Sequence, residues 1–524
     1  MTEPVAITIL PDGQTISAAT GTSLLEALSD RIRLRADCGG QGICGKCRVA
    51  IKDGGTLPPL TAGEKSALPA HLVEAGYRLA CQLPVQEALT VWIPPTGRNS
   101  DSANGKQIFS GPYPVDGGSG NGGLGLAVDL GTTTVAAYLC DLLSGRILSS
   151  AVCGNPQRRY GEDVISRIQM ACRSAEDLGR LRMLARQVVD YLADVCLAAV
   201  GSRKADIRKV MVAGNTAGQQ IFAGIDPSGL AAAPFEPATR EAVSFPAKTL
   251  DLNFRTGTPI YLMPVISGFA GGDTVACILA DRPHHKEQTR LIVDVGTNGE
   301  LVLAHGGRLW STSCATGPAF EGARISSGMC AAAGAIAACG IDPETFRFSY
   351  RTIGRNGVEH PPLGFCGSGI VDAVAALRRT GIVAPSGRLQ STMPLVAPHE
   401  NAAAGKVVLL PVDRNPAGVE ISLTQRDIRQ VQLAKAALAV GVRCLMEKAG
   451  IRKLDVTILT GAFGSTFDWH SAVAIGLLPP VDVLGKVILH PNLAGEGAVR
   501  ALLNRAQQSE ARRICRNTRY LNLS

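Results

Sequence analysis

Aromatic residues, long apolar runs and clustered basic residues are all scarce in this chain of 524 residues, of which aromatics make up 4%. No apolar run reaches the roughly 18 residues that a membrane-spanning helix needs, and the opening MTEPVAITIL lacks the features of a signal peptide. The net charge of +8 is scattered rather than gathered into Lys/Arg runs, which argues against nucleic-acid binding. We therefore expect a cytoplasmic protein with no membrane and no nucleic-acid partner.

The composition that remains is typical of a globular protein with several domains. Hydrophobic residues make up 46% and glycine contributes 59 residues, which favours aliphatic cores joined by many glycine turns. At about 150 residues per domain, the length predicts three or four domains. Residues 1–96 contain apolar segments that predict strands, and residues 97–123 are rich in glycine and predict a flexible linker. The small apolar stretch 331–340 predicts a buried helix.

Four cysteines within the first 96 residues have the spacing of metal ligands. Cys38, Cys44 and Cys47 follow the pattern C-x5-C-x2-C, and Cys81 lies further along the chain. Thiolates are soft ligands, and four of them suit an iron–sulfur cluster. The intervening glycines let the backbone wrap around a compact inorganic core and direct N–H groups at its sulfurs. A tetrahedral zinc site is the alternative, although such sites more often pair two C-x2-C knuckles.

A glycine turn between two strands occurs twice in the remainder of the chain. The copies are GLAVDLGTTTVAAYL at 125–139 and RLIVDVGTNGELVL at 290–303. In such a turn backbone N–H groups and threonine hydroxyls can face phosphate oxygens, and an aspartate at the strand end can hold Mg²⁺. A later strand in each half ends in a glycine loop, GNTAG and TGAFGS. Two α/β halves, 124–288 and 289–524, indicate an internal duplication, with chance similarity of two turns as the alternative.

Residues 3–95 resemble the plant-type and adrenodoxin-type ferredoxins, through the cysteine spacing and the segment RLACQLPV around Cys81. That resemblance implies an α+β, β-grasp fold with a 2Fe-2S cluster held by the four cysteines. The two later halves resemble the acetate and sugar kinase/Hsp70/actin superfamily, in which ribonuclease-H-like halves close over ATP. By this second resemblance, Gly461 and Gly464 of TGAFGS would lie near the adenosine.

The combination of these parts resembles the reductive activators of corrinoid-dependent methyltransferases. VDLGTTTV, NPQRRYGEDVISRI, IVDVGTNGELVL, ATGPAFEGARISSG, CGSGIVDAV and GAFGS all look like that family. The resemblance implies an ATP-hydrolysing iron–sulfur enzyme that reduces a corrinoid protein from Co(II) to Co(I) by one electron. It also implies a corrinoid methyl-carrier partner and an upstream electron donor, and it leaves a homodimer open.

The candidate residues of the ATP site come from the two turns and from the segments around them. Two acidic residues after the first turn, Glu162 and Asp163, could orient the attacking water or the metal, or could simply begin a helix. Asp273 offers either a metal-side carboxylate or a helix cap. The catalytic candidates are Asp129, Asp294, Glu162 and Asp163, and the nucleotide-binding candidates are Gly131, Thr132, Thr133, Gly296, Thr297, Asn298, Gly461 and Gly464.

Other functions use the same parts. A small-molecule kinase could combine the two halves with a redox-sensing ferredoxin domain. A non-catalytic scaffold for electron transfer, or an activator of a different low-potential enzyme, would also fit the domain order.

Overall fold

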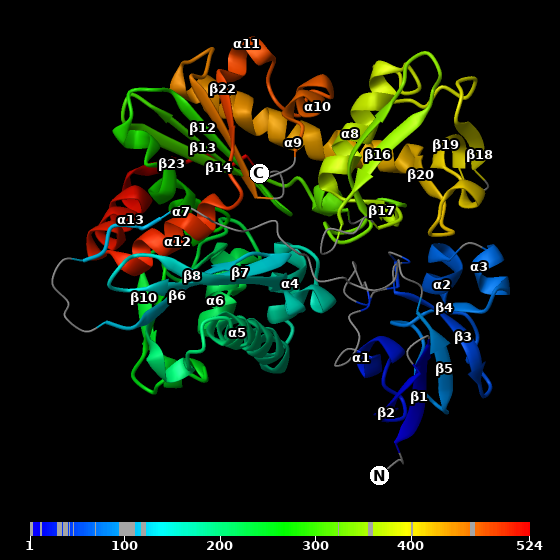
Figure 1. Cartoon of the computed structure of the whole chain (residues 1–524), viewed down its shortest axis with the longest axis horizontal. Coiled ribbons are helices and arrows are strands. Elements are labelled where there is room, and N and C mark those ends of the chain that lie inside the picture. The colour runs from blue at the N-terminus through cyan, green and yellow to red at the C-terminus, as the bar shows by residue number, and fades with distance from the viewer. Residues whose placement is uncertain are drawn as a thin grey trace. The chain divides into compact units, whose positions relative to one another are not determined.

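Two compact units make up this computed structural model, which Figure 1 shows. One comprises Met1–Asp101 with Arg158–Glu162, and the other comprises Ser102–Gln157 with Asp163–Ser524. In the described part of the chain, no helix is both long enough and apolar enough to cross a membrane. The residues described are 4–10, 13–28, 34, 40, 42–43, 45, 47–68, 70–93, 111–116, 122–322, 324–354, 360–399, 402–461 and 467–523.

The first unit is built on a mixed sheet. Its elements are β1 (Val5–Leu10), β2 (Gln14–Ala18), α1 (Leu24–Leu28), β3 (Arg48–Gly54), α2 (Ala62–Ala67), α3 (Ala70–Glu74), β4 (Tyr77–Leu79) and β5 (Leu89–Trp92). The strand order is β2-β1-β5-β3-β4, in which β1 and β5 are parallel and the other pairs are antiparallel. Ile7 and Ile9 alternate with more exposed residues along β1 and are buried with Leu24 and Leu28 of α1. This is the predicted β-grasp arrangement.

Two large sheets of the second unit share most of their topology. One contains β6 (Leu124–Leu130), β7 (Thr134–Asp141), β8 (Ile147–Gly154), β9 (Ile207–Gly214), β10 (Val243–Pro246) and β11 (Pro259–Leu262). The other contains β12 (Arg290–Val295), β13 (Gly299–His305), β14 (Arg308–Cys314), β21 (Val456–Gly461), β22 (Lys486–Leu489) and β23 (Thr518–Tyr520). The order β11-β9-β6-β7-β8 matches β22-β21-β12-β13-β14, with the same parallel and antiparallel pairs. The predicted duplication is therefore confirmed.

The helices of the second unit cover these sheets. They are α4 (Val164–Ala171), α5 (Ala175–Ala198), α6 (Thr216–Ala223), α7 (Gly272–Asp281), α8 (Gly367–Arg379), α9 (Gln425–Ala449), α10 (Trp469–Ala474), α11 (Val481–Leu484), α12 (Leu493–Leu503) and α13 (Arg505–Asn517). Helices α7 and α12 lie between the two large sheets (Figure 1) and contribute to one apolar core with both of them. They cross closely at Gly497, where a Cβ would lie 1.9 Å from the Ala276 carbonyl oxygen.

Two smaller sheets adjoin α8 and α9. They consist of β15 (Ala335–Ile341), β16 (Phe348–Thr352) and β17 (Gly364–Phe365), and of β18 (Val396–His399), β19 (Ala402–Leu410) and β20 (Ile421–Thr424). The helix predicted over 331–340 is wrong, because β15 occupies most of that stretch. Gly334 has a φ of +83°, which interrupts any helix, and β15 then pairs with β16 and β17. Tertiary pairing overrides the helix propensity of alanine here.

Part of the predicted linker lies against the second unit. Tyr113 is buried, and its backbone N–H donates to the carbonyl of Gly145 at 2.9 Å. Asp116 accepts a hydrogen bond of 2.8 Å from the backbone of Arg505. Residues 111–116 are thus held in place, whereas residues 94–110 and 117–121 lie outside the described part. The prediction of a flexible linker is untested there.

Candidate functional site

Two of the four predicted cluster ligands lie side by side in the first unit. Cys47 precedes β3 and Cys81 follows β4, and the antiparallel pairing of these strands brings both cysteines to one end of the sheet. Their sulfurs are 3.3 Å apart, far beyond the roughly 2.05 Å of a disulfide bond. Two thiolates on one tetrahedral metal, with metal–sulfur bonds of about 2.3 Å, stand about 3.8 Å apart. Cys38 and Cys44 lie outside the described residues.

Glycines shape the backbone next to these sulfurs. Gly42 and Gly45 have φ values of +76° and +67°, which L-residues with side chains rarely adopt. A Cβ on Gly42 would lie 2.7 Å from the Gln82 side chain, and one on Gly45 would lie 2.8 Å from a backbone oxygen. The Gln82 amide donates to the carbonyl of Gly40 at 3.2 Å and to the Cys81 sulfur at 3.8 Å. A sulfur pair in a close glycine cradle with an N–H donor fits an iron–sulfur cluster.

A buried ion pair fixes the strand that carries Cys81. Arg78 donates from Nε and Nη2 to the two carboxylate oxygens of Glu64, at 2.8 and 2.9 Å, and Glu64 is fully buried. Burial raises the pKa of Glu64, but the hydrogen bonds from Arg78 and from the backbone of Thr61 and Leu79 outweigh it, and the net pKa is lowered. The pair ties α2 to β4 only three residues before Cys81.

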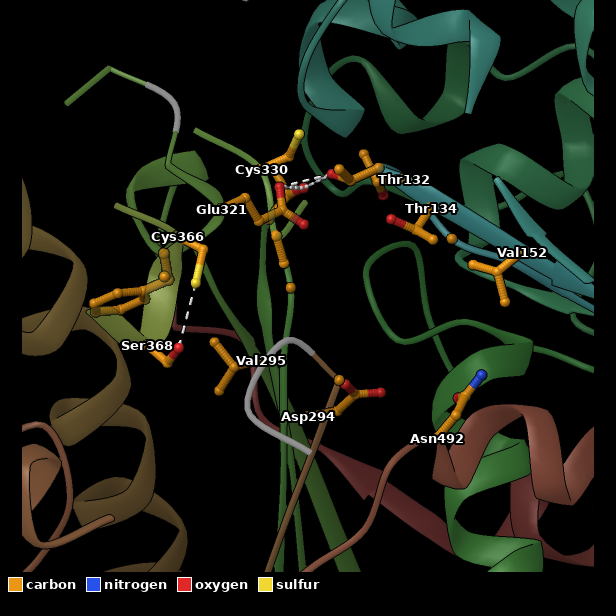
Figure 2. A pocket seen from close by; sticks show the side chains of 18 of the residues that line it. Thr132, Thr134, Val152, Asp294, Val295, Glu321, Cys330, Cys366, Ser368 and Asn492 are labelled. Atoms are coloured by element: carbon orange, nitrogen blue, oxygen red, sulfur yellow. Dashed lines mark hydrogen bonds between the residues drawn. The ribbon is translucent and has the colours of Figure 1, made fainter. Parts of the chain in front are cut away.

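The second unit contains a cavity of about 430 Å³ at the ends of β6 and β12. This volume suits a small-molecule ligand. Asp129 lies near the end of β6 and Asp294 near the end of β12. Gly461 of β21 pairs with Val295, and a Cβ on Gly461 would lie 2.2 Å from Oδ1 of Asp294. Figure 2 shows the lining side chains. The predicted residues that line the cavity are Asp129, Gly131, Thr132, Thr133, Asp294, Gly296, Thr297, Asn298 and Gly461.

The two glycine turns meet at a glutamate. The hydroxyl oxygens of Thr133 and Thr297, one from each half, are 3.1 Å apart. Both hydroxyls donate to Oε2 of Glu321, each at 2.7 Å. Figure 2 shows Glu321 directed at the first turn. Glu321 lies in the segment ATGPAFEGARISSG, from which no role for this residue was predicted.

Two asparagines that were not predicted from the sequence lie at the starts of helices and donate hydrogen bonds to the first turn and the strand before it. Asn215 caps α6 through Oδ1 and donates from Nδ2 to the Thr132 hydroxyl at 3.0 Å. Asn492 caps α12 in the same way and donates to Oδ2 of Asp129 at 2.8 Å. Both stand in the pattern N-x-A-G, which is an N-cap signal and a repeat in the sequence. That repeat could have identified them.

Acidic side chains crowd one wall of the cavity. Asp273 lies in the first turn of α7, where Gly271 rather than Asp273 is the cap residue. Glu300 lines the same wall, and burial, followed by the charges of Asp273 and Asp294, raises its pKa well above the usual value. Burial and the neighbouring carboxylates therefore disfavour the charged form of Glu300, and a divalent cation would relieve the repulsion among these groups.

The other predicted catalytic residues do not line this cavity. Asp163 caps α4 by accepting from the backbone N–H and the hydroxyl of Ser166, at 2.7 and 2.6 Å. Glu162 accepts from Nε of Arg158 at 2.8 Å. The helix-start interpretation accounts for Asp163. Gly464 lies outside the described residues.

A ferredoxin-type sheet with paired cysteines and a duplicated two-sheet unit with a phosphate-type cavity define an iron–sulfur domain joined to an actin-like ATPase. Family models agree in each region. A model of the 2Fe-2S iron-sulfur cluster binding domain matches residues 7–86. A model of the RACo middle region matches 124–286, and one of the C-terminal ASKHA domain of RACo matches 288–524.

Whole-chain comparisons give the particular family. The chain is 35% identical over 412 residues to the corrinoid activation enzyme RamQ of Eubacterium limosum, covering 76% of this chain and 68% of the relative. It is 25% identical over 388 residues to a reductase of the Co(II) methylated amine-specific corrinoid protein of Methanosarcina barkeri, with coverage of 68% and 66%. A solved structure of a reductive activator for a corrinoid, iron–sulfur protein matches with a TM-score of 0.71 and 28% identity, covering 99% of this chain and 96% of that chain. The chain therefore belongs to the RACo family, and the predicted fold and resemblance are confirmed.

Proposed function

We propose that this protein transfers one electron to the cobalt of a corrinoid methyl-carrier protein, converting Co(II) to Co(I), in a reaction that depends on ATP. One observation carries the proposal. A chain of this family combines two cysteines whose sulfurs lie 3.3 Å apart with a cavity in which two phosphate-type turns meet. The first feature suits electron transfer and the second suits ATP.

The energetics explain why one protein needs both features. A plant-type cluster has a potential near −400 mV, and the Co(II)/Co(I) couple of a resting corrinoid protein is expected to be lower. Each step of about 59 mV uphill is a tenfold penalty for one electron. ATP can offset that penalty only by favouring a state in which the cobalt is easier to reduce.

The first unit would hold the cluster through Cys38, Cys44, Cys47 and Cys81. When bound, a 2Fe-2S cluster supplies single electrons at low potential. Gln82 would donate an N–H to one ligand sulfur, which favours the reduced cluster because that form is more negative. An upstream electron donor would have to reach this end of the sheet.

The second unit would bind ATP with Mg²⁺. Asp129 and Asp294 would hold the cation, in part through water, and the crowding of carboxylates around Asp273 supports a cation there. The turn residues would bind the phosphates: Gly131, Thr132, Thr133, Gly296, Thr297 and Asn298. Gly461 and Gly464 would lie near the adenosine. We assign no catalytic role to Glu162 and Asp163.

The domain limits of this proposal are 1–96 for the ferredoxin domain, 97–123 for the linker, and 124–288 and 289–524 for the ATPase halves. A cytoplasmic location fits a low-potential cluster and a chain whose cysteines act as thiolates.

The test measures Co(I) formation directly. The anaerobically reduced protein is mixed with a Co(II) corrinoid protein, with and without Mg·ATP, and Co(I) absorbance is followed in a single turnover. We expect ATP-dependent Co(I), which Asp129→Ala and Asp294→Ala lose while retaining the cluster spectrum. Asp413→Ala, which removes an exposed carboxylate far along the sequence from the turns, is the matched control and should behave like the wild type.

Either of two results would contradict the proposal. Co(I) formation that is equally fast without ATP would remove the role of the second unit. Full ATP-dependent activity in both aspartate variants would show that the cation is held elsewhere.

A further inference from the structure

Glu321 occupies the one point in the described cavity where the two phosphate-type turns share a hydrogen-bond acceptor. A single carboxylate oxygen accepts from Thr133 and from Thr297, both at 2.7 Å. The second carboxylate oxygen of Glu321, Oε1, lies near the second turn, 4.0 Å from the position that a Cβ on Gly296 would take. Both hydroxyl distances are ordinary for a hydroxyl group that donates to an oxygen. A carboxylate oxygen therefore already occupies the position to which both turns can donate.

The backbone of Glu321 is fixed by close contacts that only glycine permits. Glu321 ends the 3-10 turn η7 (Pro318–Glu321). A Cβ on Gly322 would lie 2.0 Å from the carbonyl oxygen of Met329, and one on Gly367 of α8 would lie 1.7 Å from that of Phe320. Because these backbones touch, η7 cannot shift without moving the start of α8 and the segment around Met329.

A phosphate oxygen that binds both turns must take the hydrogen bonds that Glu321 now accepts. Two anions cannot share one pair of hydroxyl donors, because their charges repel at this distance. The phosphate concerned is the terminal one, since hydrolysis requires donors from several sides to neutralise the charge that develops on the transferred group. Among the described residues, Thr133 and Thr297 supply one hydroxyl donor from each half to the same oxygen.

We propose that Glu321 determines how this protein distinguishes ATP from ADP: its carboxylate competes with the terminal phosphate for the hydroxyls of Thr133 and Thr297, and only a triphosphate displaces it. When Glu321 is displaced, η7 shifts, and η7 moves the start of α8 and the segment around Met329 with it. Nucleotide state is thereby conveyed from the cavity to the part of the second unit that carries the two smaller sheets. This inference rests on the proposed function only in that ATP is the ligand.

Equilibrium binding without hydrolysis tests the competition. The full-length protein, its Glu321→Gln variant and its Glu321→Ala variant are titrated calorimetrically with Mg²⁺ and either ADP or β,γ-imido-ATP. Gln keeps the shape of Glu and removes its charge. Glu344→Gln removes one charge from an exposed glutamate in the turn before β16 and serves as the matched control. Because a neutral Gln accepts hydrogen bonds more weakly than a charged carboxylate, the imido analogue should bind roughly tenfold, or about 1.4 kcal/mol, more tightly to Glu321→Gln.

The expected pattern is tighter binding of the imido analogue by both Glu321 variants, little change for ADP, and no change in the control. An equal gain for both nucleotides would overturn the discrimination between them. Unchanged affinity in both variants would overturn the competition itself. Weaker binding of the analogue would also overturn it, because Glu321 would then support the ligand instead of opposing it. If the wild-type protein bound neither nucleotide, the proposed function would fail instead.

Discussion

Replacing Asn492 by alanine is expected to weaken the ATPase unit in two separable ways. The side chain caps α12 by accepting from the backbone of Gly495 at 3.0 Å. Its amide also donates to Asp129 and to the hydroxyl of Tyr138, both at 2.8 Å. All three side chains are buried, with exposed fractions of 2% or less. Alanine removes the cap and also withdraws one hydrogen bond from each of two buried polar groups.

The size of the effect follows from these contacts. Loss of an asparagine cap costs about 1 kcal/mol, and each of the two buried hydrogen bonds contributes about 0.5–1.5 kcal/mol. We expect Asn492→Ala to lower the free energy of unfolding of the second unit by about 2–4 kcal/mol. Asn504→Ala is the matched control, because Asn504 caps α13 through Ala506 and Gln507 and its side chain holds no catalytic candidate. It should cost only about 1 kcal/mol.

Urea unfolding followed by far-ultraviolet circular dichroism measures the difference, while the visible absorbance of the cluster reports the first unit. Mg·ATP affinity should fall in Asn492→Ala and not in Asn504→Ala, because only Asn492 orients Asp129. Equal destabilisation by the two substitutions would refute the reasoning, since the hydrogen bonds to Asp129 and Tyr138 would then contribute nothing.

Three further predictions concern other parts of the chain. Gln82→Leu should lower the midpoint potential of the cluster without changing its stoichiometry, because one N–H donor to a ligand sulfur is lost, and a redox titration followed by electron paramagnetic resonance measures this. Gly497→Ala should destabilise the second unit by about 1–3 kcal/mol or more, because the new Cβ would meet Ala276. In contrast, Gly179→Ala should stabilise helix α5 by about 0.5–1 kcal/mol, because a Cβ there would meet nothing within 4 Å. The pKa of Glu510 is lowered from 4.5 to about 2, because hydrogen bonds from two histidines and the charge of an arginine outweigh the effect of burial. The contribution of Glu510 to the free energy of unfolding should therefore be complete above about pH 4.5 and be lost toward pH 2. The free energies of unfolding of the wild type and of Glu510→Gln, measured across that pH range, should converge as the pH falls.

Local sequence patterns predicted the parts of the site that lie on one strand and its turn. Asp129 and Asp294 stand at strand ends in duplicated turns, and the two turns converge on one cavity. The capping box of α9 is likewise a local feature, because Thr424 and Asp427 lie within one helical turn. Such features depend on neighbouring residues alone.

Contacts between residues far apart in the sequence could not be predicted from such local patterns. Glu321 lies 188 residues from Thr133, and Asn492 lies 363 residues from Asp129. No periodicity or spacing rule connects residues that far apart. For Glu162 and Asp163 the sequence left two interpretations open, because an acidic residue that caps a helix, as Asp163 does, has the same local pattern as one that faces a ligand. Only the path of the folded backbone separates the two.

The link between Asn492 and Asp129 also shows that the two ATPase halves are not independent modules. Helix α12 follows β22 of the second sheet in sequence, yet it packs against β6 and β9 of the first sheet and presents Asn492 to Asp129. Met211 and Ala213 of β9 are buried in the core that α7 and α12 complete. Residues 124–288 alone would expose that apolar face and lose the donor that orients Asp129. Asp129 therefore acquires this donor only after α12 has been synthesised, and a nucleotide bound beside Asp129 would be coupled to both halves.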